Sequence, residues 1–144
     1  MIWLWRTPRG LERMSWRRAG LLCLAAFITV PAIGFALSGF SEPLLALDTR
    51  FTWLTFMLLA LAYSPLLSWS GFLLSVAPAR AMMRRGWGGA GPISGLGAVM
   101  GLLTGLIRSW EWEPFFLSLC AAAGAVCMAV WWGWAILTAP REAL

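Results

Sequence analysis

The sequence contains no histidine, lysine, asparagine or glutamine. Without histidine there is no imidazole to ligate haem, zinc or copper, and no histidine-based proton relay. All eleven basic residues are therefore arginines, against six acidic residues, which gives a net charge of +5. The composition excludes histidine-dependent catalytic triads, and it predicts no cofactor other than bound phospholipid.

Charge is also absent from four long runs, at residues 19–41, 51–79, 86–107 and 114–140. Each run reaches the ~20 residues that a helix needs to cross a ~30 Å hydrocarbon core. With 60% hydrophobic residues and a mean hydropathy of +0.77, a soluble domain of this size could not bury so much apolar surface. We expect an all-α polytopic membrane protein, with one four-helix transmembrane domain at 19–140 (spans about 19–40, 51–77, 92–110 and 114–138) and a cytoplasmic tail at 141–144.

Residues 1–18 mix arginine with tryptophan, which is typical of an amphipathic segment lying at the membrane interface. Thr7 followed by Pro8 favours the start of a short helix there. The basic start, the apolar run and the small residues around Ala36 also fit a signal peptide. We expect the segment to be retained and the run to form an uncleaved first span.

Three glycines, Gly97, Gly101 and Gly105, recur every four residues inside the third span. Residues four apart share one helix face, so these glycines form a smooth groove, a glycine zipper, that another backbone can approach closely. The fourth span supplies the expected partner stripe, Ala121, Ala125, Ala129 and Gly133. The groove could instead take a helix of another subunit or a flat polycyclic ligand.

Several local features complete the expected helices. Proline predicts kinks at positions 31 and 65, and loops are expected at 41–50 and 80–91. The tryptophans at 131, 132 and 134 are typical of an aromatic belt at the membrane surface. The cysteines at 23, 120 and 127 are expected to act as small buried hydrophobes.

The arginines lie mostly on one side of the expected spans. Five precede the first span, three lie in the middle loop and one is Arg141, which makes nine of eleven. The positive-inside rule then predicts that both termini lie on the cytoplasmic side of a bacterial inner membrane. Anionic lipid headgroups explain this charge better than nucleic acid does, and the candidate headgroup residues are Arg17, Arg18, Arg84 and Arg85.

No charged residue lies deep within any of the four spans, which argues against ion-coupled transport. The leading hypothesis is a non-catalytic accessory or assembly subunit of a larger membrane complex, with other integral membrane subunits and anionic lipids as its partners. One alternative is a small homo-oligomeric channel or carrier lined by the proline-kinked helices. Another is a membrane enzyme that binds a lipid phosphate through Arg84, Arg85 and Arg108.

Overall fold

The structure is a computed structural model. It describes residues 4–8, 10–47, 52–64, 69–109 and 113–139, without the side chains of residues 40–47, 69, 108 and 109. Within these ranges the chain is all helical, as the sequence predicts. Three helices are long and apolar enough to cross a membrane, at Trp16–Gly39, Ala90–Ile107 and Pro114–Leu137, so this is a helical membrane protein. The helices are α1 (Trp16–Leu47), α2 (Thr52–Ala62), α4 (Trp69–Arg84), α5 (Ala90–Ser109) and α6 (Pro114–Leu137).

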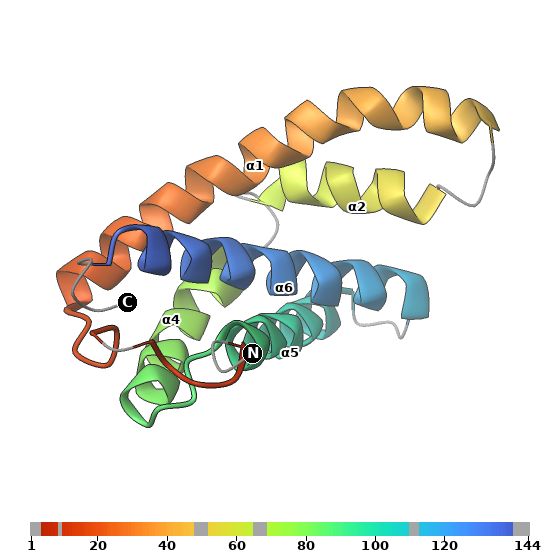
Figure 1. The fold of residues 1–144 in the computed structure, drawn as a ribbon. Coiled ribbons are helices and arrows are strands. Elements are labelled where there is room, and N and C mark those ends of the chain that lie inside the picture. The colour runs from red at the N-terminus through yellow and green to blue at the C-terminus, as the bar shows by residue number, and fades with distance from the viewer. Residues whose placement is uncertain (1–3, 9, 48–51, 65–68, 110–112, 140–144) are drawn as a thin grey trace.

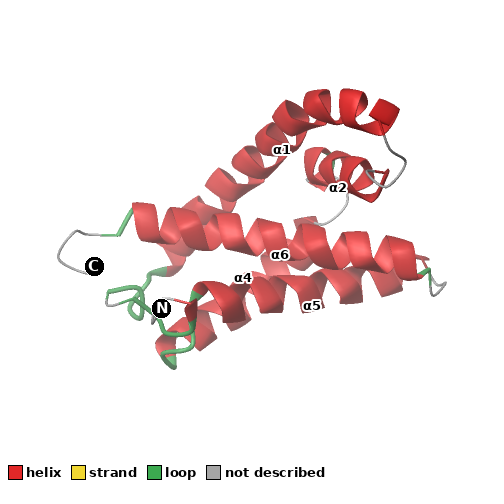
Figure 2. Cartoon of the chain, turned by 45° about the vertical axis from the view of Figure 1, so that its right-hand side comes forward, coloured by secondary structure: helices red, strands yellow, loops and turns green. Residues whose placement is uncertain are grey.

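The helices run back and forth between two ends of the molecule (Figures 1 and 2). α5 and α6 lie antiparallel and side by side, while α2 runs back along the C-terminal part of α1. α6 is central, because it contacts each of the other four helices. The main core gathers around Trp131 and Met128 of α6, where α1, α4, α5 and the N-terminal segment also meet. A smaller cluster around Val30, Leu61 and Cys127 joins α1, α2 and α6.

α1 is longer than the predicted span, which was expected to end at about residue 40. The helix continues through residues 41–47, so the predicted loop at 41–50 was wrong over that part. Leucine and alanine at positions 44–47 favour helix, and the helix continues although a proline at position 43 removes one backbone hydrogen bond and crowds the preceding turn. With 32 residues, α1 measures about 48 Å, well beyond the ~30 Å hydrocarbon core. It is continuous across Pro31, and Figure 1 shows it changing direction along its length.

The predicted second span, 51–77, is not one helix. α2 ends at Ala62, and α4 begins at Trp69 and extends past Pro78 to Arg84. Tyr63 is a turn and Ser64 is helical again, so the break lies just before the sequence Ser64-Pro65. A proline lacks the N–H donor for the carbonyl four residues before it, which favours a helix end at this place. The kink expected at Pro65 lies outside the described residues. The next loop begins at Arg85 rather than at residue 80.

The N-terminal segment folds onto the protein rather than forming a separate interfacial helix. Leu11 and Met14 are buried in the main core, whereas Trp5 and Trp16 are 71% and 58% exposed. Thr7 does not start a helix, and residues 16–18 already belong to α1. The apolar residues of this segment are thus divided, some covering the protein core and some left at the surface.

Candidate functional site

The three glycines of α5 meet the backbone of α6. A methyl group on Gly97 would overlap the carbonyl oxygen of Gly124, and one on Gly101 would overlap that of Cys120. At Gly105 an added methyl group would lie 3.1 Å from the Cys120 side chain. The glycine groove is therefore filled inside the protein, by α6, and has no room for a ligand or a further helix.

The α6 face in this contact differs from the predicted stripe. Gly101 lies near Ala121, but the other contacts come from Leu117, Cys120, Gly124 and Met128. A step of four residues turns a helix about 40° beyond a full turn, so Gly133 lies about 120° around α6 from Ala121. Accordingly Ala129 is exposed, and a methyl group on Gly133 would meet nothing within 4 Å. Mixed steps of three and four keep the real contact on one face.

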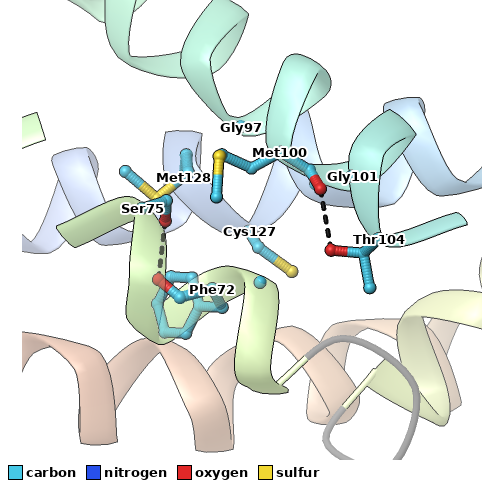
Figure 3. A pocket seen from close by; sticks show the side chains of 10 residues that line it. Phe72, Ser75, Gly97, Met100, Gly101, Thr104, Cys127 and Met128 are labelled. Atoms are coloured by element: carbon cyan, nitrogen blue, oxygen red, sulfur yellow. Dashed lines mark hydrogen bonds between the residues drawn. The ribbon is translucent and has the colours of Figure 1, made fainter. Parts of the chain in front are cut away.

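A small void lies where α4, α5 and α6 meet beside the glycine groove (Figure 3). Its volume is about 20 Å³, which is room for about one water molecule. Ser75, only 1% exposed, donates to the Phe72 carbonyl at 2.6 Å and lies 3.0 Å from the Met128 sulfur. Thr104 donates to the Met100 carbonyl, and its hydroxyl occupies the space next to Gly71. These hydroxyls serve helix packing, and the void is too small for an organic ligand.

Residues 4–8 and 10–15 form what we name the N-terminal clasp, which covers the loop between α4 and α5. The Thr7 hydroxyl donates to the Met83 carbonyl at 3.0 Å and accepts from the Gly88 N–H at 2.7 Å. Gly86, at φ +84°, ends α4 in the left-handed conformation and accepts from the Thr7 N–H. A methyl group on Gly89 would collide with the backbone of Leu4 and Trp5, so the clasp requires glycine in this loop.

The three tryptophans near the end of α6 donate hydrogen bonds to the protein itself, and the buried Trp131 does not belong to the predicted aromatic belt. Trp131 is fully buried and donates to the Ala19 carbonyl, while Trp134 donates to the Thr29 hydroxyl. Trp132 donates to the Gly88 carbonyl at 2.9 Å. An indole joins a large apolar surface to one N–H donor, so each ring fastens α6 to α1 or to the α4–α5 loop.

Folding brings the two groups of arginines to one end of the molecule. Of the predicted headgroup residues, Arg17, Arg84 and Arg85 are exposed there. Arg18 instead donates to the Ala135 carbonyl and the Thr138 hydroxyl at the C-terminus of α6, where a cation stabilises the helix dipole. The arginines described at this arginine-rich end are Arg6, Arg13, Arg17, Arg18, Arg80, Arg84 and Arg85.

Arg80 is the residue that the sequence reasoning missed. Its Nε donates to the Met14 carbonyl at 2.8 Å, and its guanidinium carbon lies 4.3 Å from the centroid of the Trp16 ring. The spacing of four between Arg80 and Arg84 would have placed both on one helix face, had the helix been extended past residue 77. The side chain of Arg108 lies outside the described residues.

An apolar groove separates α1 from α4, and we name it the α1–α4 groove. Its volume is about 430 Å³, much larger than the void beside the glycines. Trp16 stands at one end, and Gly20 lies on the groove wall, where an added methyl group would meet nothing within 4 Å. The remaining lining residues are Cys23, Leu24 and Phe27 of α1 with Phe72, Leu73, Val76 and Ala77 of α4.

The described residues include no group of three or more acidic or cysteine side chains placed to hold a metal ion. Cys23, Cys120 and Cys127 are not joined by disulfide bonds. Comparison of the chain with known protein families, with curated proteins and with solved structures found no match.

Proposed function

We propose that the protein is a non-catalytic accessory or assembly subunit of a larger membrane complex, to which it contributes helix-packing and lipid-binding surface. The observation that carries the proposal is a difference between outward faces. α1 and α5 expose large aliphatic side chains, such as Leu21, Ile28 and Ile107. α6 exposes large side chains near its two ends, at Phe115 and Leu137, and between them its outward face carries Ala129 and Gly133. Large aliphatic residues suit contact with lipid chains, and small residues suit contact with another helix.

The internal polar contacts support the same reading. Ser75, Trp131 and Trp134 use their side chains to join one helix to another. Hydrogen bonds of this kind hold helices together in a membrane, where water offers no alternative partner. The bundle thus has the character of a rigid scaffold, and its outward faces are the surfaces left for partners.

The proposal includes four membrane crossings. α2 and α4 together lead back from the far end of α1 to the arginine-rich end, so the two helices would make the fourth crossing as a broken span. By the positive-inside rule, the arginine-rich end would lie on the cytoplasmic side of a bacterial inner membrane. Cysteine labelling from each side of the membrane tests this. Labelling of position 84 from the outer side would contradict it.

The test of the subunit proposal is purification in mild detergent followed by mass spectrometry of co-purifying membrane proteins, for the wild type and for Gly133→Leu. Because the space beside Gly133 is open, leucine should leave the folded chain intact while blocking a helix docked on this face. We expect Gly133→Leu to lose a partner subunit that the wild type retains.

The matched control is Gly95→Leu on α5, where an added methyl group also meets nothing within 4 Å. It should keep the partner. A wild-type chain that purifies as a homo-oligomer with no other subunit would contradict the proposal and favour a small channel or carrier. Loss of the partner in both variants would contradict the assignment of the docking face to α6.

A further inference from the structure

Arg80 is a partly buried cation with no acidic partner among the residues that the structure describes. In the described part of the chain its contacts are the Met14 carbonyl and the Trp16 ring, and no carboxylate is among them. These contacts fix the plane of the guanidinium and use one of its five N–H donors, which leaves the terminal nitrogens for an anion. A charge taken partly out of water without a counter-charge is costly, so this position favours a bound anion.

The helix register places this cation at the mouth of the α1–α4 groove. Phe72, Val76 and Arg80 follow one another at steps of four along α4, and the first two line the groove. Trp16 both lines the groove from α1 and stacks on the Arg80 guanidinium. The polar mouth and the apolar groove therefore form one continuous feature.

The dimensions of the groove match one leaflet of a bilayer. Along α1 the lining runs from Trp16 to Phe27, a rise of ~16 Å. Half of the ~30 Å hydrocarbon core is ~15 Å. The volume of about 430 Å³ also falls within the ~300–1,000 Å³ of typical small-molecule sites. A groove that is apolar along this depth and cationic at its mouth is complementary to a lipid, with one acyl chain in the groove and the anionic headgroup at the mouth.

We propose that the α1–α4 groove binds one anionic phospholipid, with an acyl chain between the helices and the phosphate on Arg80. Charge complementarity carries the choice of lipid, because Arg84 is exposed one turn beyond Arg80 and Arg17 is exposed nearby on α1. Glu12 is exposed at the same end, and the described arginines there outnumber it. The inference rests on the proposed function only for its lipid-binding surface, and it names the lipid class and the site.

The test is native mass spectrometry of the full chain, purified in mild detergent and depleted of lipid. It is titrated with phosphatidylglycerol or phosphatidylethanolamine of identical acyl chains. Both lipids carry the phosphate, but only phosphatidylglycerol has a net negative charge. The wild type should therefore bind one phosphatidylglycerol per chain about fivefold more tightly than phosphatidylethanolamine, the size expected for ~1 kcal/mol of attraction between an arginine and an anionic lipid. Arg80→Gln should bring the two affinities to within about twofold, whereas the exposed control Arg13→Gln should keep the preference.

A second variant keeps the test valid if Arg80→Gln disturbs the N-terminal clasp. Gly20→Leu places a side chain in the groove from a position where an added methyl group meets nothing within 4 Å, so it should weaken binding of both lipids about tenfold. Gly95→Leu, equally open but outside the groove, should weaken neither. Glycerol phosphate, a headgroup without chains, should not compete with the lipid.

Equal affinity for the two lipids in the wild type would overturn the inference, as would equal effects of Arg80→Gln and Arg13→Gln. Competition by glycerol phosphate would assign the cations to a free phosphate instead. The proposed function fails separately. A chain that binds phosphatidylglycerol through Arg80 yet co-purifies with no other subunit keeps this inference and loses the subunit role.

Discussion

The α5–α6 contact and the α1–α4 groove are both boundaries between apolar helices, yet one is closed and the other open. At the first, Gly97 and Gly101 let two backbones touch, and the adjoining void is only about 20 Å³. At the second, Phe27 and Phe72 help to line a groove of about 430 Å³. Glycine also occurs at the second boundary, at Gly20, but no backbone approaches it.

The difference teaches that a small residue creates an opportunity for contact and that its neighbours decide whether the contact forms. In α5 three glycines repeat on one face, and the backbone of α6 contacts this face at Gly124 and at the Cys120 carbonyl. In α1 the neighbours of Gly20 on the groove wall are large, and they hold α4 away. Helix association in lipid depends on close van der Waals contact, which explains why the repeated small face closes and the mixed face stays open.

Breaking the closed boundary should have the largest effect. In Gly101→Leu the new side chain overlaps the Cys120 backbone, which cannot move without shifting α6, so we expect a loss of about 3 kcal/mol in unfolding free energy. Gly101→Ala already introduces the overlapping methyl group and should cost about 1–2 kcal/mol. Thermal unfolding in detergent measures both. A loss below 0.5 kcal/mol for the leucine variant would show that α6 does not lie on this face.

The same boundary shows how far the sequence alone could lead. The steps of four in α5 predict a close helix contact, because residues four apart share a face. The partner positions on α6 could not be read from a stripe of small residues, since steps of four drift around a helix. The contacts of Cys120 and Met128 carry no small-residue signal, and only the packed structure identifies them.

Breaking the clasp beside the groove should have an intermediate effect. Thr7→Val keeps the shape of the side chain but removes the hydroxyl that joins the Met83 carbonyl and the Gly88 N–H. An unsatisfied buried donor costs about 1–3 kcal/mol, so amide hydrogen exchange at Gly88 should accelerate at least fivefold. Thr7→Ser retains the hydroxyl and serves as the control. Unchanged exchange in Thr7→Val would mean that the clasp does not hold this loop.

The arginine-rich end was the harder part to predict. The uneven distribution of arginines in the sequence predicted one end that contacts anionic lipid headgroups, and Arg17, Arg84 and Arg85 are exposed at the arginine-rich end. Because the predicted span ended at residue 77, Arg80 was expected in a loop, whereas α4 continues through Pro78 to Arg84. Trp131 was assigned to the membrane surface for lack of information on long-range contacts, and its partner, the Ala19 carbonyl, lies more than a hundred residues away in the sequence.

Filling the open boundary should have the smallest effect on the lipid-free protein. At Gly20 an added methyl group meets nothing within 4 Å, and leucine replaces a poor helix former. The unfolding free energy of Gly20→Leu should therefore equal or exceed that of the wild type by up to about 1 kcal/mol. Thermal unfolding in the same detergent provides the comparison with Gly101→Leu. A loss above 2 kcal/mol would mean that α4 closes onto α1 and that no groove exists.

The central claim is that backbone fills one boundary and lipid fills the other, and its most direct test is the stability gained on adding phosphatidylglycerol. A ligand that binds only the folded state stabilises it by about 2.7 kcal/mol at a hundredfold excess over its dissociation constant. At this hundredfold excess over the wild-type dissociation constant, we predict a gain of about 2.7 kcal/mol for the wild type and for Gly95→Leu, and about 1.4 kcal/mol for Gly20→Leu, whose affinity is expected to be about tenfold weaker. An equal gain in Gly20→Leu would contradict the account, because the lipid would then act outside the α1–α4 groove.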